Sequence, residues 1–99
     1  MNSIFISLPL SGNPIDWSRA RCEEAKAKYA KDGDIVVTPF DVITDLSIPY
    51  ALCVAKRMEA VLGSDHVIFL NGWADSKTCN LELNACTLYG IDYHVDAKL

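Results

Sequence analysis

The sequence predicts an α/β protein in which a parallel sheet of about four strands and three helices form a three-layer fold of the flavodoxin-like or Rossmann-like kind. Two observations support this prediction. Short apolar runs alternate along the chain with longer segments of helical periodicity. Every expected strand except the last is followed by a helix, and such crossovers join parallel strands. No internal repeat or linker interrupts the 99 residues, so we expect one domain over residues 1–99.

Four short segments have the composition of strands, because apolar and β-branched residues dominate them and turn-forming residues lie between them. The clearest is His66-Val-Ile-Phe-Leu70, which Asn71-Gly72 ends. The expected strands are residues 4–8, 35–38, 66–70 and 92–95.

The first helix is expected to begin with Asn13 as its N-cap and Pro14 in its first position. It should run to about Lys31, where Asp32-Gly33 would end it. The apolar and small residues expected on its inner face are Ser18, Cys22, Ala25 and Tyr29.

A loop over residues 39–46 should precede the second helix, which Ser47 would cap. The third helix should begin after Asp75 or Ser76, either of which can cap it, and end at Gly90. The inward-facing residues expected are Ala51, Val54, Ala55, Met58, Val61 and Leu62 in the second helix, and Leu81, Ala85 and Leu88 in the third.

Composition and charge argue against several classes of protein. A hydrophobic share of 51% and a charged share of 22% are those of a globular domain rather than a disordered chain. A net charge of −4 without a basic run argues against binding to a nucleic acid polymer. No apolar run approaches the ~20 residues of a membrane span, and the first residues lack the positive region of a signal peptide. We therefore expect a cytoplasmic protein that does not bind membranes.

The cysteines form no Cys-x-x-Cys pair, and each falls in an expected helix with apolar neighbours. Reduced, buried thiols are therefore favoured over disulfides or a metal site. The phosphate-binding patterns GxGxxG and GxxxxGK[ST] are absent. We expect no metal ion and no cofactor. The four cysteines are Cys22, Cys53, Cys79 and Cys86.

The carboxyl ends of parallel strands lie at one edge of a sheet, where open α/β folds bind their ligands. Carboxylates at this edge can act as nucleophiles or general acids. Hydroxyl groups and free helix N–H groups suit phosphate or sugar oxygens, and an aromatic ring could stack on a base or sugar. The residues expected at this edge are Ser7, Ser11, Asp41, Asn71, Trp73, Asp75, Ser76 and Glu82.

Glu82 is notable because it lies in the second turn of the third helix among mostly apolar neighbours. Cys79 and Cys86 share its helix face, at i−3 and i+4. His66 begins a strand and His94 lies near the end of the chain, so neither has an evident partner, and both are expected to be structural.

Each candidate also has an ordinary structural interpretation. Glu82 could be a solvated or capping acid, and Asp75 and Ser76 could be helix caps only. Trp73 could serve packing or an interface, and Asp41 could be a turn residue.

Two stretches resemble the nucleoside 2-deoxyribosyltransferase-like superfamily: Ile4-Phe-Ile-Ser-Leu-Pro-Leu-Ser-Gly12 and Gly72-Trp-Ala-Asp-Ser-Lys-Thr-Cys-Asn-Leu-Glu82. The chain looks most like a small phage and bacterial branch of it, and it is also similar to the 2′-deoxynucleoside 5′-phosphate N-hydrolases. The order of segments agrees along nearly the whole chain, including Pro39-Phe-Asp41 after the second strand and Asp65 before the third.

The resemblance implies an enzyme that cleaves the N-glycosidic bond of a 2′-deoxynucleoside or its 5′-monophosphate. Glu82 matches the glutamate that attacks the anomeric carbon, after which a second base (transferase) or water (hydrolase) resolves the deoxyribosyl-enzyme. Ser76 matches a serine that contacts the 5′-phosphate in the nucleotide hydrolases, and Asp75 could bind the sugar. The substrate-binding residues expected are Ser7, Pro9, Ser11, Gly12, Asp41, Gly72, Trp73, Asp75 and Ser76.

Two positions depart from the family pattern. Thr78 stands where the family generally has Gly, and Arg57 stands where it often has an Asp that assists the leaving base. A guanidinium can instead bind a phosphate or a carboxylate, so Arg57 is a candidate phosphate contact. Characterised relatives complete their sites with a neighbouring subunit, which implies a homo-oligomer with shared sites.

Three functions therefore stay open. The leading one is the enzyme with Glu82 as its nucleophile, acting on a small-molecule nucleoside or nucleotide. The second is a non-catalytic module that senses or sequesters a nucleotide, which Arg57 and Thr78 favour. The third is an interaction domain that uses Trp73 and Tyr89 at an interface.

Overall fold

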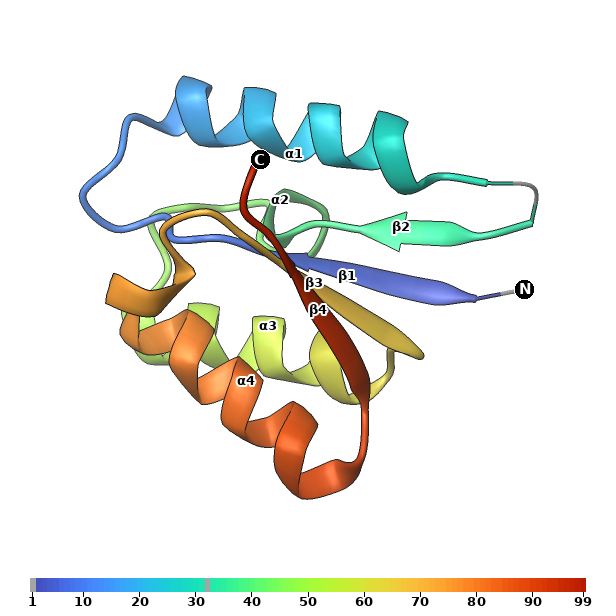
Figure 1. Cartoon of the computed structure of the whole chain (residues 1–99). Helices are drawn as coiled ribbons and strands as arrows, with labels where there is room; N and C mark the ends of the chain where they lie inside the picture. The colour runs from blue at the N-terminus through green and yellow to red at the C-terminus, as the bar shows by residue number, and fades with distance from the viewer. Residues whose placement is uncertain (1, 32) are drawn as a thin grey trace.

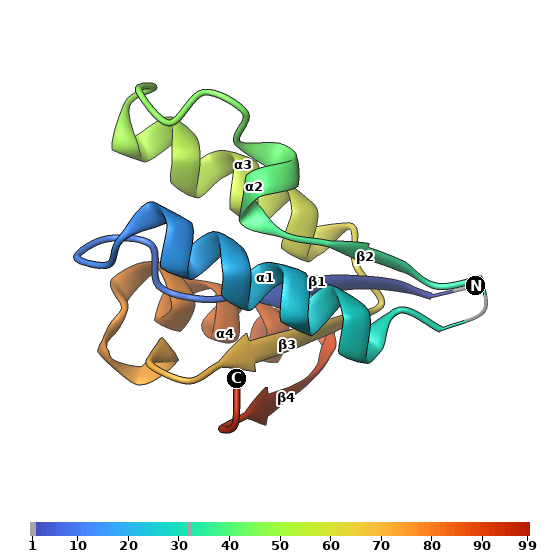
Figure 2. The ribbon, with the colours of Figure 1, turned by 90° about the horizontal axis from the view of Figure 1, so that it is seen from above.

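The computed structural model describes residues 2–31 and 33–99 as a parallel sheet with helices on both faces (Figure 1). The strands are β1 (Ser3–Ser7), β2 (Ile35–Val37), β3 (His66–Leu70) and β4 (Asp92–Asp96). The helices are α1 (Ile15–Tyr29), α2 (Pro39–Val42), α3 (Tyr50–Leu62) and α4 (Lys77–Tyr89), with a 3-10 turn η1 (Trp73–Asp75). Helix α1 covers one face of the sheet, and α3 and α4 cover the other (Figures 1 and 2). The expected fold class is confirmed, with α2 added to the three expected helices.

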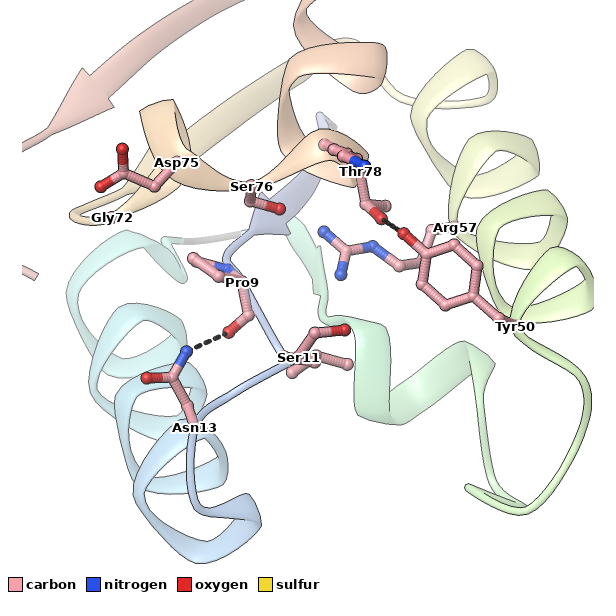
Figure 3. A pocket seen from close by; sticks show the side chains of 11 residues that line it. Pro9, Ser11, Asn13, Tyr50, Arg57, Gly72, Asp75, Ser76 and Thr78 are labelled. Carbon is pink, nitrogen blue, oxygen red and sulfur yellow. Dashed lines mark hydrogen bonds between the residues drawn. The ribbon is translucent and has the colours of Figure 1, made fainter.

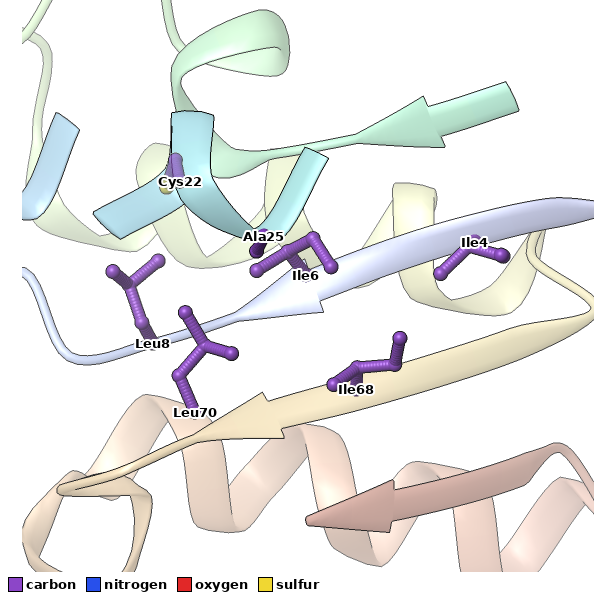
Figure 4. Close-up of a cluster of buried hydrophobic side chains, with 7 residues drawn as sticks. All are labelled: Ile4, Ile6, Leu8, Cys22, Ala25, Ile68 and Leu70. Atoms are coloured by element: carbon purple, nitrogen blue, oxygen red, sulfur yellow. The ribbon is translucent and has the colours of Figure 1, made fainter. Parts of the chain in front are cut away.

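Alternate residues of β1 face opposite sides of the sheet, because successive side chains of a strand point to opposite faces. Ile4 and Ile6 pack with Cys22 of α1 in one buried cluster (Figure 4). Phe5 belongs to the cluster on the other side, beneath α3 and α4. Ser7 lies on the same side as Phe5, so its buried hydroxyl is presented to these two helices.

The strand order is β2-β1-β3-β4, and every neighbouring pair is parallel. From β1 the chain crosses by α1 to β2, and it then returns past β1 to form β3 on the other side. The connections that leave β1 and β3 therefore run to helices on opposite faces of the sheet. Such a switch point opens a crevice between the carboxyl ends of the two strands, where open α/β sheets bind ligands.

The prediction that Asn13 and Ser47 cap the first two long helices is wrong. A proline precedes α1 and α3, and neither helix has a side-chain cap. The Asn13 amide instead donates to the carbonyl oxygen of Pro9 over 3.5 Å. Ser47 donates through its hydroxyl to Asp45 over 2.6 Å, and α3 begins only at Tyr50. A fixed proline φ prepares the first turn of each helix in place of a cap.

The prediction of a continuous loop over residues 39–46 is also wrong, because α2 lies within it. Pro39 occupies the first turn of α2, and Asp41 Oδ2 accepts a hydrogen bond of 2.9 Å from the Thr38 backbone N–H. This capping box closes a single helical turn directly after β2.

The predicted boundaries of the last helix are confirmed. Ser76 Oγ accepts a hydrogen bond of 3.1 Å from the Cys79 backbone N–H, and Gly90 ends α4 with a left-handed φ of 69°. Helix α1 ends at Tyr29, and Asp32, expected just after its end, lies outside the described residues.

The inward face expected for α1 is confirmed, whereas those expected for α3 and α4 are confirmed only in part. Val61 and Ala85 are buried and Val54 and Met58 are half-buried, but Ala51 and Ala55 are exposed. Helix α3 buries Arg57 and Val61, and Leu62 is 47% exposed. In α4, Leu81 and Leu88 are 46% and 80% exposed. The covered face of each helix also contains a charged residue, Arg57 in α3 and Glu82 in α4, which apolar periodicity alone does not place inside. The residues that α4 buries are Thr78, Cys79, Glu82, Ala85 and Cys86.

All four cysteines are free thiols, and Cys22, Cys79 and Cys86 are buried as expected, while Cys53 is half-buried. Burial raises the pKa of the Cys22 and Cys86 thiols to about 11. Both thiols are therefore protonated at neutral pH and unreactive. Among the described residues, no helix has the length and apolar character that crossing a membrane requires.

A chain of hydrogen bonds ties β4 to β3 and α1. His66 Nε2 lies 2.7 Å from His94 Nδ1, and His94 Nε2 lies 3.3 Å from the Tyr29 hydroxyl. Tyr29 and Lys28 both donate to the Asp96 carboxylate. Neither histidine has an evident partner in the sequence, whereas in the structure each contacts the other. The β3–β4 register makes the two rings diagonal neighbours on one face of the sheet, which no local pattern reveals.

The histidine pair should make stability depend on pH. Burial, followed by repulsion from His94, lowers the pKa of His66 below its usual 6.5, with Asp92 acting in the opposite direction. The folded protein then binds fewer protons than the unfolded chain, so the free energy of unfolding should fall as the pH drops through about 6.5. His66→Gln should flatten this part of the profile in urea unfolding between about pH 5 and 8. An unchanged slope in the variant would contradict the assignment to His66.

Candidate functional site

A polar cavity of about 600 Å³ opens at the carboxyl edge of the sheet, in the crevice between β1 and β3 (Figure 3). The β1–α1 loop contributes Pro9, Ser11 and Asn13. Helix α3 contributes Tyr50 and Arg57. The β3–α4 connection contributes Gly72, Asp75, Ser76, Lys77 and Thr78.

An apolar cavity of about 280 Å³ adjoins the polar one. Five residues line both cavities, so the two are direct neighbours: Leu10, Ser11, Tyr50, Arg57 and Thr78. The remaining walls of the apolar cavity come from the start of α1, the segment after α2, and α3. These walls are Ile15, Ile43, Leu46, Ile48, Cys53 and Val54.

The two loops at the mouth of the polar cavity approach each other closely at Gly72. Its φ is +95°, and a Cβ built there would lie 3.3 Å from Pro9 Cγ. A side chain at this position would therefore meet both backbone strain and a tight contact. Gly72 lets η1 turn back over the β1–α1 loop and brings the Ser76 cap to the cavity.

Glu82 lies beneath the cavities and is 0% exposed. Its Oε1 accepts hydrogen bonds from Ser7 Oγ (2.6 Å) and Arg57 Nη2 (2.9 Å), and its Oε2 accepts one from Arg57 Nε (2.8 Å). The carboxylate and the guanidinium thus form a bidentate ion pair inside the protein. The glutamate lies in a buried polar cluster rather than in the mostly apolar setting expected.

Arg57 is 3% exposed, yet it lines both cavities, whereas Glu82 lines neither. Burial would lower the pKa of the guanidinium, but the charge and the hydrogen bonds of Glu82 raise this pKa above its usual value. The guanidinium therefore stays charged. A ligand that enters the polar cavity meets a cation first, with the carboxylate behind it.

Cys79 completes a buried cluster of four polar groups, the Arg57–Glu82 cluster, formed by Ser7, Arg57, Cys79 and Glu82. Cys79 Sγ lies 3.3 Å from Ser7 Oγ and 3.8 Å from Arg57 Nη2. The cluster joins the carboxyl end of β1 to α3 and to the first two turns of α4. These elements meet only in the folded protein, at the switch point of the sheet.

Not every expected site residue lines the cavity. Ser7 lies below it, in the Arg57–Glu82 cluster, and Gly12 is exposed in the β1–α1 loop outside the lining. Asp41 caps α2 and pairs with Lys26 at 3.0 Å. Trp73 packs on Phe69, with ring centroids 6.1 Å apart. The expected residues that do line the polar cavity are Pro9, Ser11, Arg57, Gly72, Asp75 and Ser76.

Tyr50 is the main lining residue that the sequence reasoning missed. Its hydroxyl lies 2.6 Å from Thr78 Oγ1, and the two side chains meet where the cavities join. One signal could have found it: a helix that follows a parallel strand begins at the carboxyl edge of the sheet, so its first residue is near the site. The other lining residues not predicted to bind substrate are Leu10, Asn13, Lys77 and Thr78.

Two comparisons bear on the family of the chain. A family model described as "Domain of unknown function (DUF4406)" matches residues 2–93. A search of curated proteins finds no match. Within residues 2–31 and 33–99, no group of three or more His, Cys, Asp or Glu side chains is arranged to hold a metal ion.

Arg57→Met should destabilise the protein by about 3–5 kcal/mol, because it leaves the buried Glu82 carboxylate without a counter-charge. The double variant Arg57→Met/Glu82→Leu should recover much of this loss, since neither charge remains. Urea unfolding of the wild type, both single variants and the double variant measures the coupling energy.

Lys56→Met is a matched control, because it makes the same charge change at the neighbouring, exposed position of α3. It should alter the free energy of unfolding by less than about 0.5 kcal/mol. Strictly additive effects of the Arg57 and Glu82 substitutions would show that the pair contributes nothing as a pair.

Proposed function

We propose that this chain, which belongs to the DUF4406 family, cleaves the N-glycosidic bond of a 2′-deoxynucleoside or its 5′-monophosphate. The description of the family assigns no activity. Glu82 would be the nucleophile. The observation that carries the proposal is the position of this carboxylate, which lies on α4 at the switch point, directly behind a cavity of nucleotide size. The resemblance of the loop-helix stretch 72–82 to deoxyribosyltransferase-like enzymes supports the same residue.

The polar cavity suits the phosphate and sugar of such a ligand. Ser76, Lys77 and Thr78 form the start of α4, where free N–H groups and the positive end of the helix dipole favour an anion. Asp75 lines the same cavity and could accept hydrogen bonds from sugar hydroxyls. The adjoining apolar cavity offers Ile43 and neighbouring side chains to the flat face of a base.

The chemistry would proceed in two displacements. A Glu82 oxygen forms a bond to the anomeric carbon while the C–N bond breaks, and the electron pair leaves with the base, which takes a proton from solvent. Water or an acceptor base then attacks the same carbon, loses a proton, and releases the Glu82 carboxylate. Positive charge that develops on the sugar in each transition state is stabilised by the carboxylate in a site shielded from bulk water.

Glu82→Gln should lower the rate of base release by a factor on the order of 10³ or more, because an amide oxygen cannot form the glycosyl ester. Chromatography would measure free base from a panel of 2′-deoxynucleosides and 5′-monophosphates, with and without an acceptor base. Glu59→Gln, an exposed acid on α3, is the matched control and should behave as wild type. Base release by Glu82→Gln at the wild-type rate would refute the mechanism.

A second candidate is a non-catalytic module that binds a nucleotide. The specific observation in its favour is that Glu82 lines neither cavity and is held by Arg57. A ligand at 100 times its Kd should then add about 2.7 kcal/mol to the stability without being consumed. Detectable product from any nucleotide would exclude this candidate.

A further inference from the structure

We propose that Arg57 makes access to Glu82 conditional on an oxyanion. In the free protein the guanidinium covers the carboxylate. A phosphate-like group bound at the start of α4 would compete with Glu82 for the same guanidinium, draw it into the polar cavity, and uncover the carboxylate. This inference rests on the proposed function and names Arg57 as the residue that would select phosphorylated substrates.

The first support is the unequal use of the guanidinium nitrogens. Arg57 Nε and Nη2 both donate to Glu82. The third nitrogen, Nη1, makes no hydrogen bond to the described residues. It is also not fully buried, because the fully buried unpaired atoms of these residues do not include it. The guanidinium points into the polar cavity between Ser76 and Ser11 (Figure 3). A buried cation thus holds the carboxylate with one edge and leaves the opposite side to a ligand.

The second support is an independent set of anion-binding groups on the same cavity. The N–H groups of Lys77 and Thr78 lie in the first turn of α4 and have no partner in the part of the chain that the structure describes. Ser76 adds a hydroxyl and Lys77 adds a charged side chain, whereas Asp75, on the same connection directly before Ser76, adds one negative charge to the lining. An oxyanion held here would lie next to Arg57.

The third support is electrostatic. A guanidinium in the protein interior needs a counter-charge, and among residues 2–31 and 33–99 only Glu82 supplies one by direct contact. A phosphate offers the same paired oxygens with more negative charge, so it can replace the carboxylate as the bidentate partner. Ser7 remains as a hydrogen-bond donor to Glu82 after the exchange. A nucleoside without a phosphate lacks this means of moving Arg57.

The test measures exposure of Glu82 directly and does not depend on catalysis. The wild-type protein would be treated with a water-soluble carbodiimide and an amine, with added sodium sulfate or with sodium chloride at equal ionic strength. Peptide mass spectrometry would report the labelling of each carboxylate. Sulfate should raise labelling of Glu82 on the order of tenfold over chloride, and labelling of the exposed Glu59 should not change.

Variants separate the action of Arg57 from a general effect of charge. Arg57→Met should give strong labelling of Glu82 in chloride and no further rise in sulfate. Lys56→Met, the exposed control on the same helix, should respond to sulfate as wild type does. If Arg57→Met does not fold, Arg57→Lys provides the comparison, because an ammonium holds the carboxylate at a single point and should raise labelling in chloride.

Each outcome decides the proposal. Sulfate that raises the melting temperature but leaves Glu82 unlabelled would overturn it, since the anion would then bind without uncovering the carboxylate. Failure of sulfate to bind would overturn it as well. Labelling that rises with sulfate while no nucleotide loses its base would support the exchange at Arg57 and refute the glycosidase function. If the exchange at Arg57 and the glycosidase function both hold, sulfate should also accelerate base release from unphosphorylated deoxynucleosides. Sulfate would then supply the anion that these substrates lack.

Discussion

The buried ion pair between Arg57 and Glu82 is the interaction on which the arrangement of this protein depends. It connects α3 to α4 and, through Ser7, to the end of β1, with three hydrogen bonds on one carboxylate. Removing both charges from water is costly, and the bidentate geometry together with the Ser7 hydroxyl offsets that cost. The same pair explains why apolar side chains such as Leu81 and Leu88 remain on the outer face of α4.

The topology brings the pair to the place where ligands bind in open α/β sheets. Because β1 and β3 are neighbours while their following helices lie on opposite faces, their carboxyl ends leave a crevice between them. Gly72 lets the loops above this crevice meet against Pro9. Arg57 lines both the polar and the apolar cavity, so one side chain connects the buried Glu82 carboxylate to both cavities.

The candidate site was predictable in part. Glu82, Ser76 and Gly72 lie within one short stretch around the start of α4, and strand, turn and cap signals place that stretch at the sheet edge. Arg57 was expected to bind a phosphate or a carboxylate, and the carboxylate it contacts is that of Glu82, 25 positions away. Nothing local to either residue indicates this pairing, because it depends on how α3 packs on α4. Tyr50 was missed because a proline, rather than the expected Ser47 cap, sets the start of α3.

The sequence by itself determined the four strands, the parallel topology and both ends of α4, because these follow from apolar runs, turn residues and caps a few positions apart. Tertiary structure alone decided that Arg57 and Glu82 pair on the covered faces of α3 and α4, that His66 pairs with His94, and that Arg57 lies between the cavities and Glu82. The reason is physical. Local signals act through backbone conformation within one or two turns, whereas neutralisation of buried charge and strand register depend on contacts between residues far apart in the chain.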